Sequence, residues 1–377
     1  MDFELNAEQR LIQQTAREFA AREIYPVSAE HDAQAKWPAE IIRKAWELGL
    51  MNITVPEAYG GPGLGALEMV LVTEQLTWGC LGIGAPCCLN GLVSEVVIQG
   101  REEQRRSYLG RMVAGELGAY AVTEPGAGSD VAGVQTRAVR RGDEYLLSGS
   151  KIWISNAPQA TFFTVLARTA PDAGHRGLSF FLVDKDAAGL EVGGHIPKMG
   201  QQAGHTAEVF FNDVVVPRSA LIGEEGAGFK IAMKAFDGSR PMVAAFAVGL
   251  MQRCLDLSLS YAKERKSFGK PIIEHQAIAH KLAEMQMRLD ASRLMAYQAA
   301  WLADAGKRNT MQASCAKAFA CDSAMWVATE AMQIYGGYGY SKEYPVEKLF
   351  RDAKVLQVYE GTSEIQRNII ARELATR

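Results

Sequence analysis

Apolar residues in the first 115 positions recur every three or four residues, which predicts helices with one buried face. Asn6 is a residue type that caps helices, and the predicted inward positions after it are Leu11, Ile12, Thr15, Phe19 and Ile24. A second helix is expected to begin at Pro38 and to end at Gly49, with inward positions at Ile41, Ile42, Ala45, Trp46 and Leu48. The glycine-rich stretch 56–65 does not follow a strand, so it is interpreted as a turn and not as a dinucleotide-binding loop.

From about residue 116 to residue 226 the pattern changes to short apolar runs separated by turn residues. Gly142 and Asp143 stand between two strand-like runs, as in a β-hairpin. Further β-rich runs cover residues 161–167, 178–183 and 207–216. Regularly spaced short strands with glycine turns predict a small barrel or sandwich.

After Gly228 the pattern is helical again, with long helices expected over 250–263, 275–305 and 311–336. Alanine-rich stretches there favour close contact between helices, and the many methionines are interpreted as core filling. The order of the patterns predicts an α+β protein with three domains. These are an N-terminal α-helical domain over 1–115, a middle β-barrel or sandwich domain over 116–226, and a C-terminal four-helix bundle domain over 227–377.

The composition narrows the class of protein. Of the 377 residues, 48% are hydrophobic and 22% are charged, as in an ordinary globular protein. The net charge of -3 argues against a nucleic-acid partner, and no apolar run is expected to be long enough for a membrane span. The first residues form neither a secretory signal nor a basic transit peptide, so a cytoplasmic bacterial protein is expected. A mature mitochondrial matrix protein without its leader would begin in the same way.

The six cysteines are scattered and form no CxxC pair, and histidines are sparse. A zinc site is therefore not expected, and buried free thiols in a reducing compartment are the favoured interpretation. No metal ligands are predicted.

The candidate chemistry lies in three separate segments. Glu360 stands in the run Tyr-Glu-Gly-Thr-Ser near the end of the chain. A glutamate in such a loop is commonly only a solvated side chain. A catalytic role for Glu360 is favoured because two segments that contain glycine and hydroxyl residues, 120–130 and 151–156, lie far upstream. Together the three segments suggest a bound flavin with one general base facing it.

Five motifs in one order then carry a family resemblance. The chain resembles the acyl-CoA dehydrogenases nearly end to end, and it is most similar to their medium- and short-chain branch. The motifs lie at 122–130, 265–269, 333–337, 344–348 and 359–362. The resemblance implies FAD-dependent α,β-dehydrogenation of an acyl-CoA to its trans-2-enoyl-CoA. It also implies that the electrons pass to an electron-transferring flavoprotein.

The resemblance implies that Glu360 is the catalytic base for the α-proton. A carboxylate in water has a pKa of about 4.3 and is a weak base, but burial against flavin and acyl chain raises that value. Gly361 permits a close approach to the ligand, and the Glu360 backbone N–H is expected to donate to the thioester carbonyl. The substrate-binding residues implied are Ser129, Asp237, Ser239, Arg240, Tyr359, Glu360 and Gly361.

The resemblance also assigns the FAD contacts. Arg265 and its neighbours are expected to reach the pyrophosphate of a flavin bound mainly by another subunit, so an oligomer is expected, namely dimers paired into a tetramer. Trp153 is expected against the flavin ring and Ser155 near N5. The full predicted set is Tyr120, Thr123, Gly128, Ser129, Trp153, Ser155, Arg265, Ser267, Phe268, Gln276, Gln333, Gly336, Gly337, Thr362 and Glu364.

The chain departs from the family in the loop 199–206, where Gln202, Gly204 and His205 replace a common Arg, Ser and Asp. This difference puts the CoA contacts and partner docking in doubt, although His205 is interpreted as an ordinary loop residue. Residues 87–90 are expected at the bottom of the acyl pocket, so the acyl group cannot be copied from a relative. The alternatives are a dehydrogenase or oxidase for a carrier-bound acyl group, and a non-catalytic flavin-binding protein, against which the retained Glu360 argues.

Overall fold

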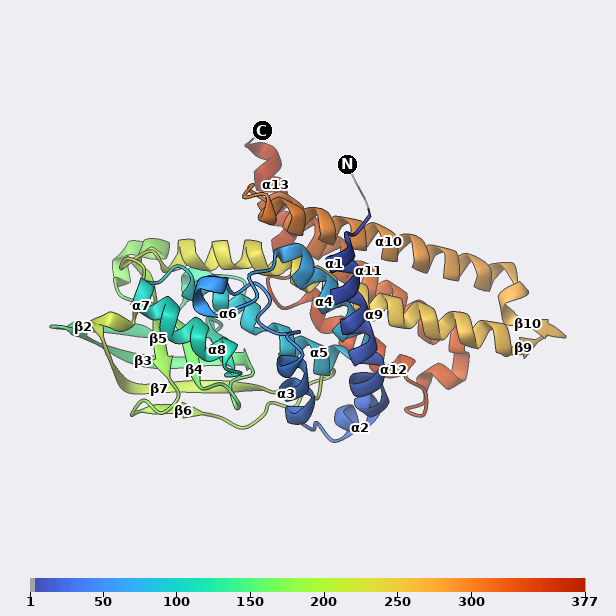
Figure 1. Cartoon of the computed structure of the whole chain (residues 1–377), viewed down its shortest axis with the longest axis horizontal. Coiled ribbons are helices and arrows are strands. Elements are labelled where there is room, and N and C mark those ends of the chain that lie inside the picture. Colours follow the sequence, from blue (N-terminus) through green and yellow to red (C-terminus); the bar gives the residue numbers. More distant parts are fainter. Residues whose placement is uncertain (1–3, 377) are drawn as a thin grey trace.

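The N-terminal helices begin and end where the sequence places its caps. A computed structural model of the chain describes residues 4–376 (Figure 1). In it, α1 (Ala7–Phe19) starts at Asn6, whose side chain accepts a 2.8 Å hydrogen bond from Gln9 N, while the Gln9 side chain accepts from Asn6 N. A π-helical turn over Ala20–Ile24 and α2 (Ser28–Ala33) follow. The predicted cap at Asn6 is therefore confirmed.

The helix α3 (Ala39–Glu47) follows Pro38 and has Leu48 as its C-cap, so the predicted stop at Gly49 lies directly after the cap. Gly49 adopts φ +71°, and the N–H groups of Gly49 and Leu50 donate back to the carbonyls of Trp46 and Ala45 at 2.9 Å. This arrangement is the Schellman motif, and it needs a left-handed residue at the glycine position.

Two predicted inward positions are wrong. Leu11 is 65% exposed and Leu48 is 54% exposed. Leu48 lies at the C-cap of α3, where the chain is already turning away from the core. Spacing predicts which residues share a face, but it does not predict how far a neighbouring element covers that face.

Shorter helices then lead to the sheet. They are α4 (Ala66–Gly79), α5 (Leu81–Cys88), α6 (Asn90–Val97), α7 (Glu102–Gln104) and α8 (Gly110–Val113). Residues 81–87 of α5 are all buried, so this helix lies inside the protein.

The middle of the chain forms one eight-stranded sheet with the order β6-β7-β3-β2-β4-β5-β8, and β1 pairs with β4. Gly142 and Asp143 form the two-residue turn between β2 and β3, which confirms the predicted hairpin. β2 and β4 are joined only at Arg137 and Arg168, so the sheet divides into two halves at that point. The strands are β1 (Gly118–Ala121), β2 (Arg137–Arg141), β3 (Glu144–Ser155), β4 (Phe162–Arg168), β5 (Leu178–Asp184), β6 (Leu190–Val192), β7 (Thr206–Pro217) and β8 (Leu221–Ile222).

The two faces of β4 and β5 belong to different cores. Phe163 and Phe181 pack with residues of β3 and β7, so this core lies between the two halves of the sheet. Phe162 and Phe180, which alternate with them, pack against apolar residues of α6 and the start of α9. The alternation explains why both strands are buried at every position except the last.

The C-terminal helices are α9 (Gly228–Glu264), α10 (Gln276–Asp304), α11 (Thr310–Tyr335), α12 (Val346–Lys354) and α13 (Ser363–Ala375), with a small hairpin of β9 (Lys266–Ser267) and β10 (Lys270–Pro271). α9 begins well before the helix predicted from residue 250, although Pro241 lies inside it. Pro241 has no N–H for the carbonyl of Asp237, and the side chain of Asn309 donates to that carbonyl at 3.2 Å. This distant partner explains why the helix continues.

α9 also corrects the expectation about apolar length. Its most apolar window has a mean hydropathy of 1.4, so by length and composition alone the helix could cross a membrane. However, 78% of that window is buried inside the protein, which makes α9 a core helix. Val70, Leu81 and Ala85 from the N-terminal part share this core with α9, α10 and α11.

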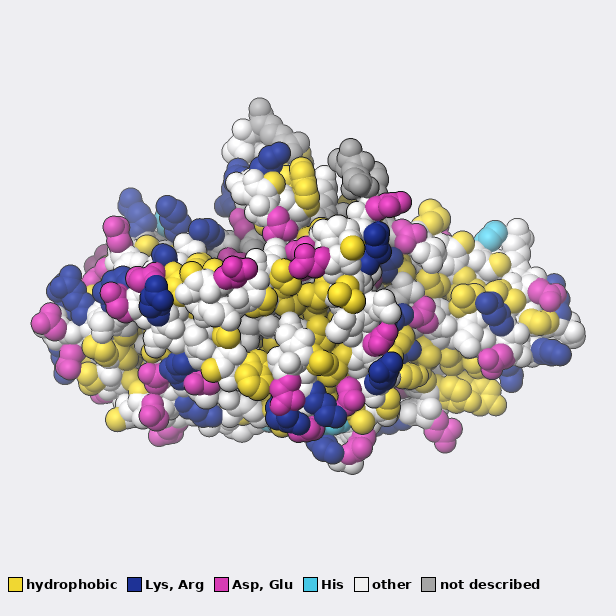
Figure 2. Space-filling view, in the orientation of Figure 1, with side chains coloured by type: hydrophobic (Ala, Val, Ile, Leu, Met, Phe, Trp, Pro, Cys, Tyr) yellow, Lys and Arg dark blue, Asp and Glu magenta, His cyan; other side chains and the backbone are white. Residues whose placement is uncertain are grey.

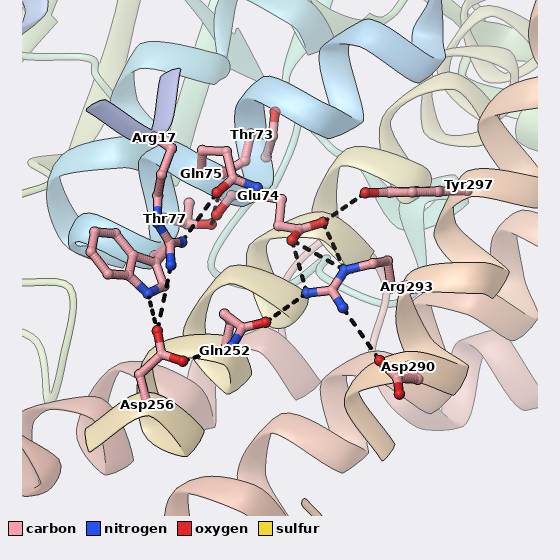
Figure 3. A network of polar contacts seen from close by, with 11 residues as sticks. Arg17, Thr73, Glu74, Gln75, Thr77, Gln252, Asp256, Asp290, Arg293 and Tyr297 are labelled. Atoms are coloured by element: carbon pink, nitrogen blue, oxygen red, sulfur yellow. Dashed lines mark hydrogen bonds and ion pairs between the residues drawn. The ribbon is translucent and has the colours of Figure 1, made fainter. Parts of the chain in front are cut away.

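A polar network connects the N-terminal helices to the C-terminal bundle (Figure 3). Buried Glu74 of α4 accepts hydrogen bonds from Arg293 and Tyr297 of α10, at 2.9 Å and 3.1 Å. Arg17 of α1 and the Trp78 indole both reach Asp256 of α9, and the Arg17 guanidinium lies 3.4 Å from the centre of the Trp78 ring. These contacts fix α1 and α4 on the bundle.

Candidate active site

Glu360 lies in a turn between α12 and α13 whose backbone is unusual. Glu360 has φ +54° and Gly361 has φ +84°, so two consecutive residues are left-handed. A glycine tolerates this conformation, whereas a glutamate is strained in it. Thr362 ends the turn as the N-cap of α13, where its hydroxyl accepts from Ile365 N at 3.2 Å. The turn therefore aims one carboxylate at a defined place.

The Glu360 carboxylate meets a hydroxyl and a buried guanidinium from α9. Ser239 Oγ donates to Glu360 Oε2 at 2.9 Å. Arg240 is 3% exposed, forms a 2.6 Å ion pair with Asp237, and leaves its Nε without a partner within residues 4–376. Thr310 of α11 donates to the other oxygen of Asp237 at 2.6 Å. The structure thus brings together most of the predicted substrate-binding set.

Burial raises the pKa of Glu360, although part of the residue remains open to solvent. The hydrogen bond from Ser239 and the charges of Arg240 and Lys317 act in the opposite direction. Burial is the larger effect, because a carboxylate loses hydration when protein atoms surround it. The result is a stronger base than a glutamate in water.

Tyr120, at the end of β1, connects this cluster to the sheet. Its ring packs edge-on against Phe236 of α9 at 5.8 Å, and its buried hydroxyl has no partner among the described residues. Burial, followed by the nearby charge of Glu360, raises the pKa of Tyr120. Ser129, in contrast, is exposed on the loop 122–130, and no hydrogen bond joins it to the Glu360 cluster within the described chain.

The predicted flavin residues of the sheet surround an irregularity in β3. The register between β3 and β7 shifts between Lys151 and Ile154, which marks a bulge. At this bulge Trp153 has φ +62°, and its side chain is 54% exposed. The neighbouring Ile152 N donates to Thr123 O at 2.9 Å, which holds the loop 122–130 beside the bulge. The bulge turns the indole out of the sheet and leaves its face available.

The loop next to Trp153 leaves its backbone accessible. A side chain at Gly126 or Gly128 would meet no atom within 4 Å, so these positions face open space. Ser155 lies at the end of β3, two residues after Trp153. An exposed aromatic face, open glycine backbone and adjacent hydroxyls suit a flat cofactor that carries phosphates. This group therefore fits FAD.

A second group of predicted flavin residues lies around β9 and β10. A pocket of about 680 Å³ is lined there by Arg265, Ser267, Phe268, Gly336 and Gly337 among others. Phe268 is 94% exposed with φ +52°. Gln276 and Gln333 are exposed on α10 and α11, the helices that border this pocket.

The two groups lie in different parts of the molecule, because the first lies on β1, β3 and the loop 122–130 and the second lies around β9 and β10. Figure 1 shows the sheet at one end of the long axis and the β9–β10 hairpin at the other. Thr362 and Glu364 form a third location, where they line a pocket of about 320 Å³ with Asp322 and Arg367. One copy of the chain therefore does not bring all the predicted flavin residues together.

The divergent loop 199–206 contacts Tyr359, the residue that precedes Glu360. The amide of Gln201 donates to Tyr359 Oη at 3.4 Å and its backbone N–H donates to Asp352. His205 is not an unattached loop residue, since its ring stacks on His195 at 4.4 Å and contacts Ala35 O at 2.9 Å. Gln201 has no local signal in the sequence, because its partner Tyr359 lies far along the chain.

The predicted acyl-pocket segment is only partly available to a ligand. Cys87 is buried, and the side chain of Asn90 is occupied by bonds to Asn52, Glu116 and Gly118. Cys88 is half-buried and accepts from Thr73 Oγ1 at 3.5 Å. Within residues 4–376, no group of His, Cys, Asp or Glu side chains could hold a metal ion.

The fold and the site define a flavin-dependent oxidoreductase of acyl thioesters, and comparison with known proteins gives the family. The chain belongs to the acyl-CoA dehydrogenase family, with matches to its N-terminal domain over 6–116, its middle domain over 119–214 and its C-terminal domain over 226–375. FAD is the cofactor of this family.

Several relatives are similar over their whole length. The chain is 43% identical to the cyclohexane-1-carbonyl-CoA dehydrogenase of Geobacter metallireducens, over 99% of this chain and 98% of that one. It is 41% identical to the acryloyl-CoA reductase (NADH) of Anaerotignum propionicum, over 100% and 97%. The solved butyryl-CoA dehydrogenase of Megasphaera elsdenii matches with a TM-score of 0.97, 39% identity and full coverage of both chains.

Proposed function

We propose that the chain converts an acyl-CoA to the trans-2-enoyl-CoA, with Glu360 as the base that removes the α-proton. The observation that carries this proposal is a single carboxylate held by Ser239 beside Arg240, with its pKa raised by burial. A base whose pKa lies closer to the working pH abstracts a carbon-bound proton more effectively. Bound FAD supplies the acceptor for the β-hydrogen, which leaves as hydride toward N5.

The cluster also suits the charge that develops on the substrate. Removal of the α-proton places negative charge on the thioester oxygen, and we assign the backbone N–H of Glu360, in its left-handed turn, as a donor to that oxygen. Asp237, Arg240, Tyr359 and Gly361 shape the surroundings, and the exposed Ser129 is the substrate contact proposed from the loop 122–130.

We further propose that two copies build each flavin site. One copy contributes Tyr120, Thr123, Gly128, Ser129, Trp153 and Ser155, and its neighbour contributes Arg265, Ser267, Phe268, Gln276, Gln333, Gly336 and Gly337. The two groups lie on different elements, the sheet and the surroundings of the β9–β10 hairpin, which Figure 1 shows apart in one copy, and this supports the arrangement. Thr362 and Glu364 complete the set, and the assembly is a dimer of dimers.

Electron-transferring flavoprotein is the proposed acceptor of the electrons, in a bacterial cytoplasm. A structural relative reported with the electron-transferring flavoprotein of Acidaminococcus fermentans has a TM-score of 0.97 and 40% identity, which supports this partner.

On the face shown in Figure 2, acidic and basic side chains are interspersed, so that face offers no block of one sign to nucleic acid.

A carrier-bound substrate is the second candidate. The prolyl acyl carrier protein oxidase AnaB matches with a TM-score of 0.91, 31% identity, and coverage of 98% of this chain and 100% of that one. The unusual loop 199–206, which touches Tyr359 through Gln201, also favours a difference in how the thioester carrier is recognised.

The test is flavin bleaching by a panel of straight, branched and aromatic acyl-CoAs under argon, followed by air. We expect rapid bleaching by an acyl-CoA and slow recovery in air. Bleaching only by acyl-carrier-protein thioesters, or immediate recovery in air, favours the second candidate. Glu360→Gln should keep the flavin and lose bleaching, while the exposed control Glu343→Gln bleaches normally; normal bleaching by Glu360→Gln would remove Glu360 from its role.

A further inference from the structure

The left-handed turn at Glu360 is hydrogen-bonded by two side chains, one from α11 and one from α13, that the proposed reaction does not use. Lys317 of α11 is fully buried, and its ammonium donates to the carbonyl of Gly361 at 2.6 Å. Gln366 of α13 is fully buried as well. Its amide donates to the carbonyls of Glu360 and Gly361, at 3.1 Å and 3.0 Å. Both carbonyls of the strained pair are therefore bound by side chains.

These contacts leave the turn little freedom. A side chain at Gly361 would lie 2.6 Å from the amide nitrogen of Gln366. Glycine is therefore required at this position for two reasons, the hydrogen bonds of Gln366 and the positive φ of Gly361 itself. The carboxylate of Glu360 is held separately, by Ser239 of α9. Three helices thus meet at two residues, and a backbone that is costly to form is over-determined by its surroundings.

A lysine that is completely buried needs a reason, because an ammonium without water is unfavourable. A neutral donor would suffice to bind one carbonyl. What the ammonium adds is a positive charge close to the base, and burial correspondingly lowers the pKa of Lys317 while the nearby Cys321 and Glu360 favour its charged form.

We propose that Lys317 and Gln366 are positioning residues that lock the Glu360–Gly361 turn, and that Lys317 also supplies a fixed positive charge that keeps the base ionised. The proposal rests on the proposed role of Glu360. Gln366 acts through geometry alone, whereas Lys317 acts through geometry and charge. This difference makes the two contributions separable.

The other charged and titratable groups near the carboxylate come from α9, β1, α11, α13 and the turn before α13. They are Arg240, Asp237, Tyr120, Tyr359, Cys321, Asp322 and Arg372. Arg240 also favours the ionised base, but Asp237 pairs with it and offsets its charge. Lys317 forms no ion pair within residues 4–376, and the nearby Asp322, which also acts on it, is itself paired with Arg367.

The experiment compares Lys317→Met with Gln366→Met by the rate of anaerobic flavin bleaching across pH. Both should bleach roughly ten-fold or more slowly than wild type, since a small misplacement of a base is costly. The rate depends on ionised Glu360, so it rises with pH through the pKa of that group. This rise is the acid limb of the pH profile. Loss of the Lys317 charge should move the acid limb about one pH unit higher, while Gln366→Met leaves it in place. Lys317→Arg should restore the position of the limb.

Controls keep the outcome clear. The exposed Lys230→Met variant should behave as wild type, and flavin absorbance and thermal unfolding report occupancy and folding. If Lys317→Met does not fold, Lys317→Gln keeps a donor without the charge and should still show the displaced limb. Bleaching rates within about two-fold of wild type in both methionine variants would overturn the positioning role. An unmoved limb in the uncharged Lys317 variant would overturn the role of its charge.

A second measurement separates this proposal from the proposed function. The carboxylic-acid infrared band that disappears in Glu360→Gln reports the protonation of Glu360 without turnover. We expect that band to persist to higher pH in Lys317→Met than in wild type. If no thioester bleaches the wild-type flavin, the dehydrogenase proposal fails, and this titration still decides whether Lys317 holds the base ionised.

Discussion

Ser239 Oγ donates a 2.9 Å hydrogen bond to Glu360 Oε2, across a sequence separation of 121 residues. Ser239 lies on the buried face of α9, next to Arg240. The strained turn and the core helix are therefore coupled at the carboxylate itself. The hydrogen bond is one of the causes that lower the pKa of Glu360 against the larger effect of burial.

Removal of that hydroxyl should shift the pH profile. In Ser239→Ala the ionised form of Glu360 loses a donor, so its pKa rises further. We expect the acid limb of the bleaching rate to move by about one unit to higher pH, because a hydrogen bond to a charged group contributes roughly 1.5–3 kcal/mol. Stopped-flow absorbance from acid to neutral pH measures the limb. The exposed Ser260→Ala serves as the control, and an unchanged limb in Ser239→Ala would contradict this coupling.

Glu360 should also make the protein less stable at neutral pH. Its folded pKa lies above the ordinary value of 4.5, so the native state binds that proton more tightly than the unfolded state. The stabilisation this group contributes is complete below the unfolded pKa and is lost as pH rises through the folded pKa. Glu360→Gln should therefore be more stable than wild type near neutral pH.

Urea unfolding of wild type and Glu360→Gln, repeated near pH 7 and near pH 4, measures this effect. The difference should shrink at the lower pH. Glu343→Gln, at an exposed position, should show no such change. A wild type as stable as Glu360→Gln at both values would show that the burial of this carboxylate has no energetic consequence.

Arg265 should matter for cofactor retention more than for folding. It follows α9 directly, is exposed, and lies 5.5 Å from the Tyr338 ring. Loss of a charge-assisted contact to a phosphate should weaken FAD binding about ten- to hundred-fold in Arg265→Ala. Titration of apoprotein with FAD, followed by fluorescence, gives the affinity.

Two further variants interpret that affinity. Arg265→Lys keeps the charge without the planar fork and should fall between wild type and Arg265→Ala. Lys266→Ala, on the neighbouring exposed residue, should bind FAD as wild type does. Full affinity in Arg265→Ala would exclude the proposed phosphate contact.

Lys151 and Glu124 form a buried ion pair that supports the flavin loop. The ammonium is 2.8 Å from Glu124 and 3.0 Å from the carbonyl of Val122, and Glu124 also accepts from the N–H groups of Gln135 and Thr136. Burial lowers the pKa of Lys151 to about 8, and the charge of Glu124 opposes that change. Lys151→Met should cost about 3–5 kcal/mol, because it leaves a buried carboxylate without its partner.

Denaturant unfolding monitored by circular dichroism measures that loss. The double variant Lys151→Met/Glu124→Gln should recover part of it, since the unpaired charge is then absent. Flavin should dissociate more readily from the single variant, because the loop 122–130 loses its anchor. A loss below about 1 kcal/mol in Lys151→Met would mean that the pair is not coupled to folding.

Local chemistry was sufficient to predict much of the fold. Asn6 and Gly49 mark helix ends because their preferences act within a single turn, and Gly142–Asp143 marks a hairpin for the same reason. Pro241 acted in the opposite direction, since its local effect is to break a helix. The carbonyl of Asp237 that Pro241 leaves free is bound by Asn309, a distant residue.

The site likewise contains residues that a local motif predicts and residues that only the folded structure identifies. Glu360 and the glycine-rich loop could be proposed from sequence because their motifs are contiguous. Lys317 and Gln366 could not, since a lysine or glutamine inside a helix has no local signature for binding a carbonyl of a distant turn. The Trp153 bulge was equally hidden, because it depends on the register of β3 against β7.

The placement of Trp153 on β3 and of Arg265 at the C-terminal end of α9 has a genetic consequence. On the proposed arrangement, a copy with a substitution at Trp153 still contributes an unaltered hairpin to the flavin site of its neighbour. A copy with a substitution at Arg265 still contributes an unaltered sheet to its own flavin site. Two alleles that are each inactive alone would then complement one another in a cell that expresses both, because some mixed assemblies contain a site made entirely of undamaged halves.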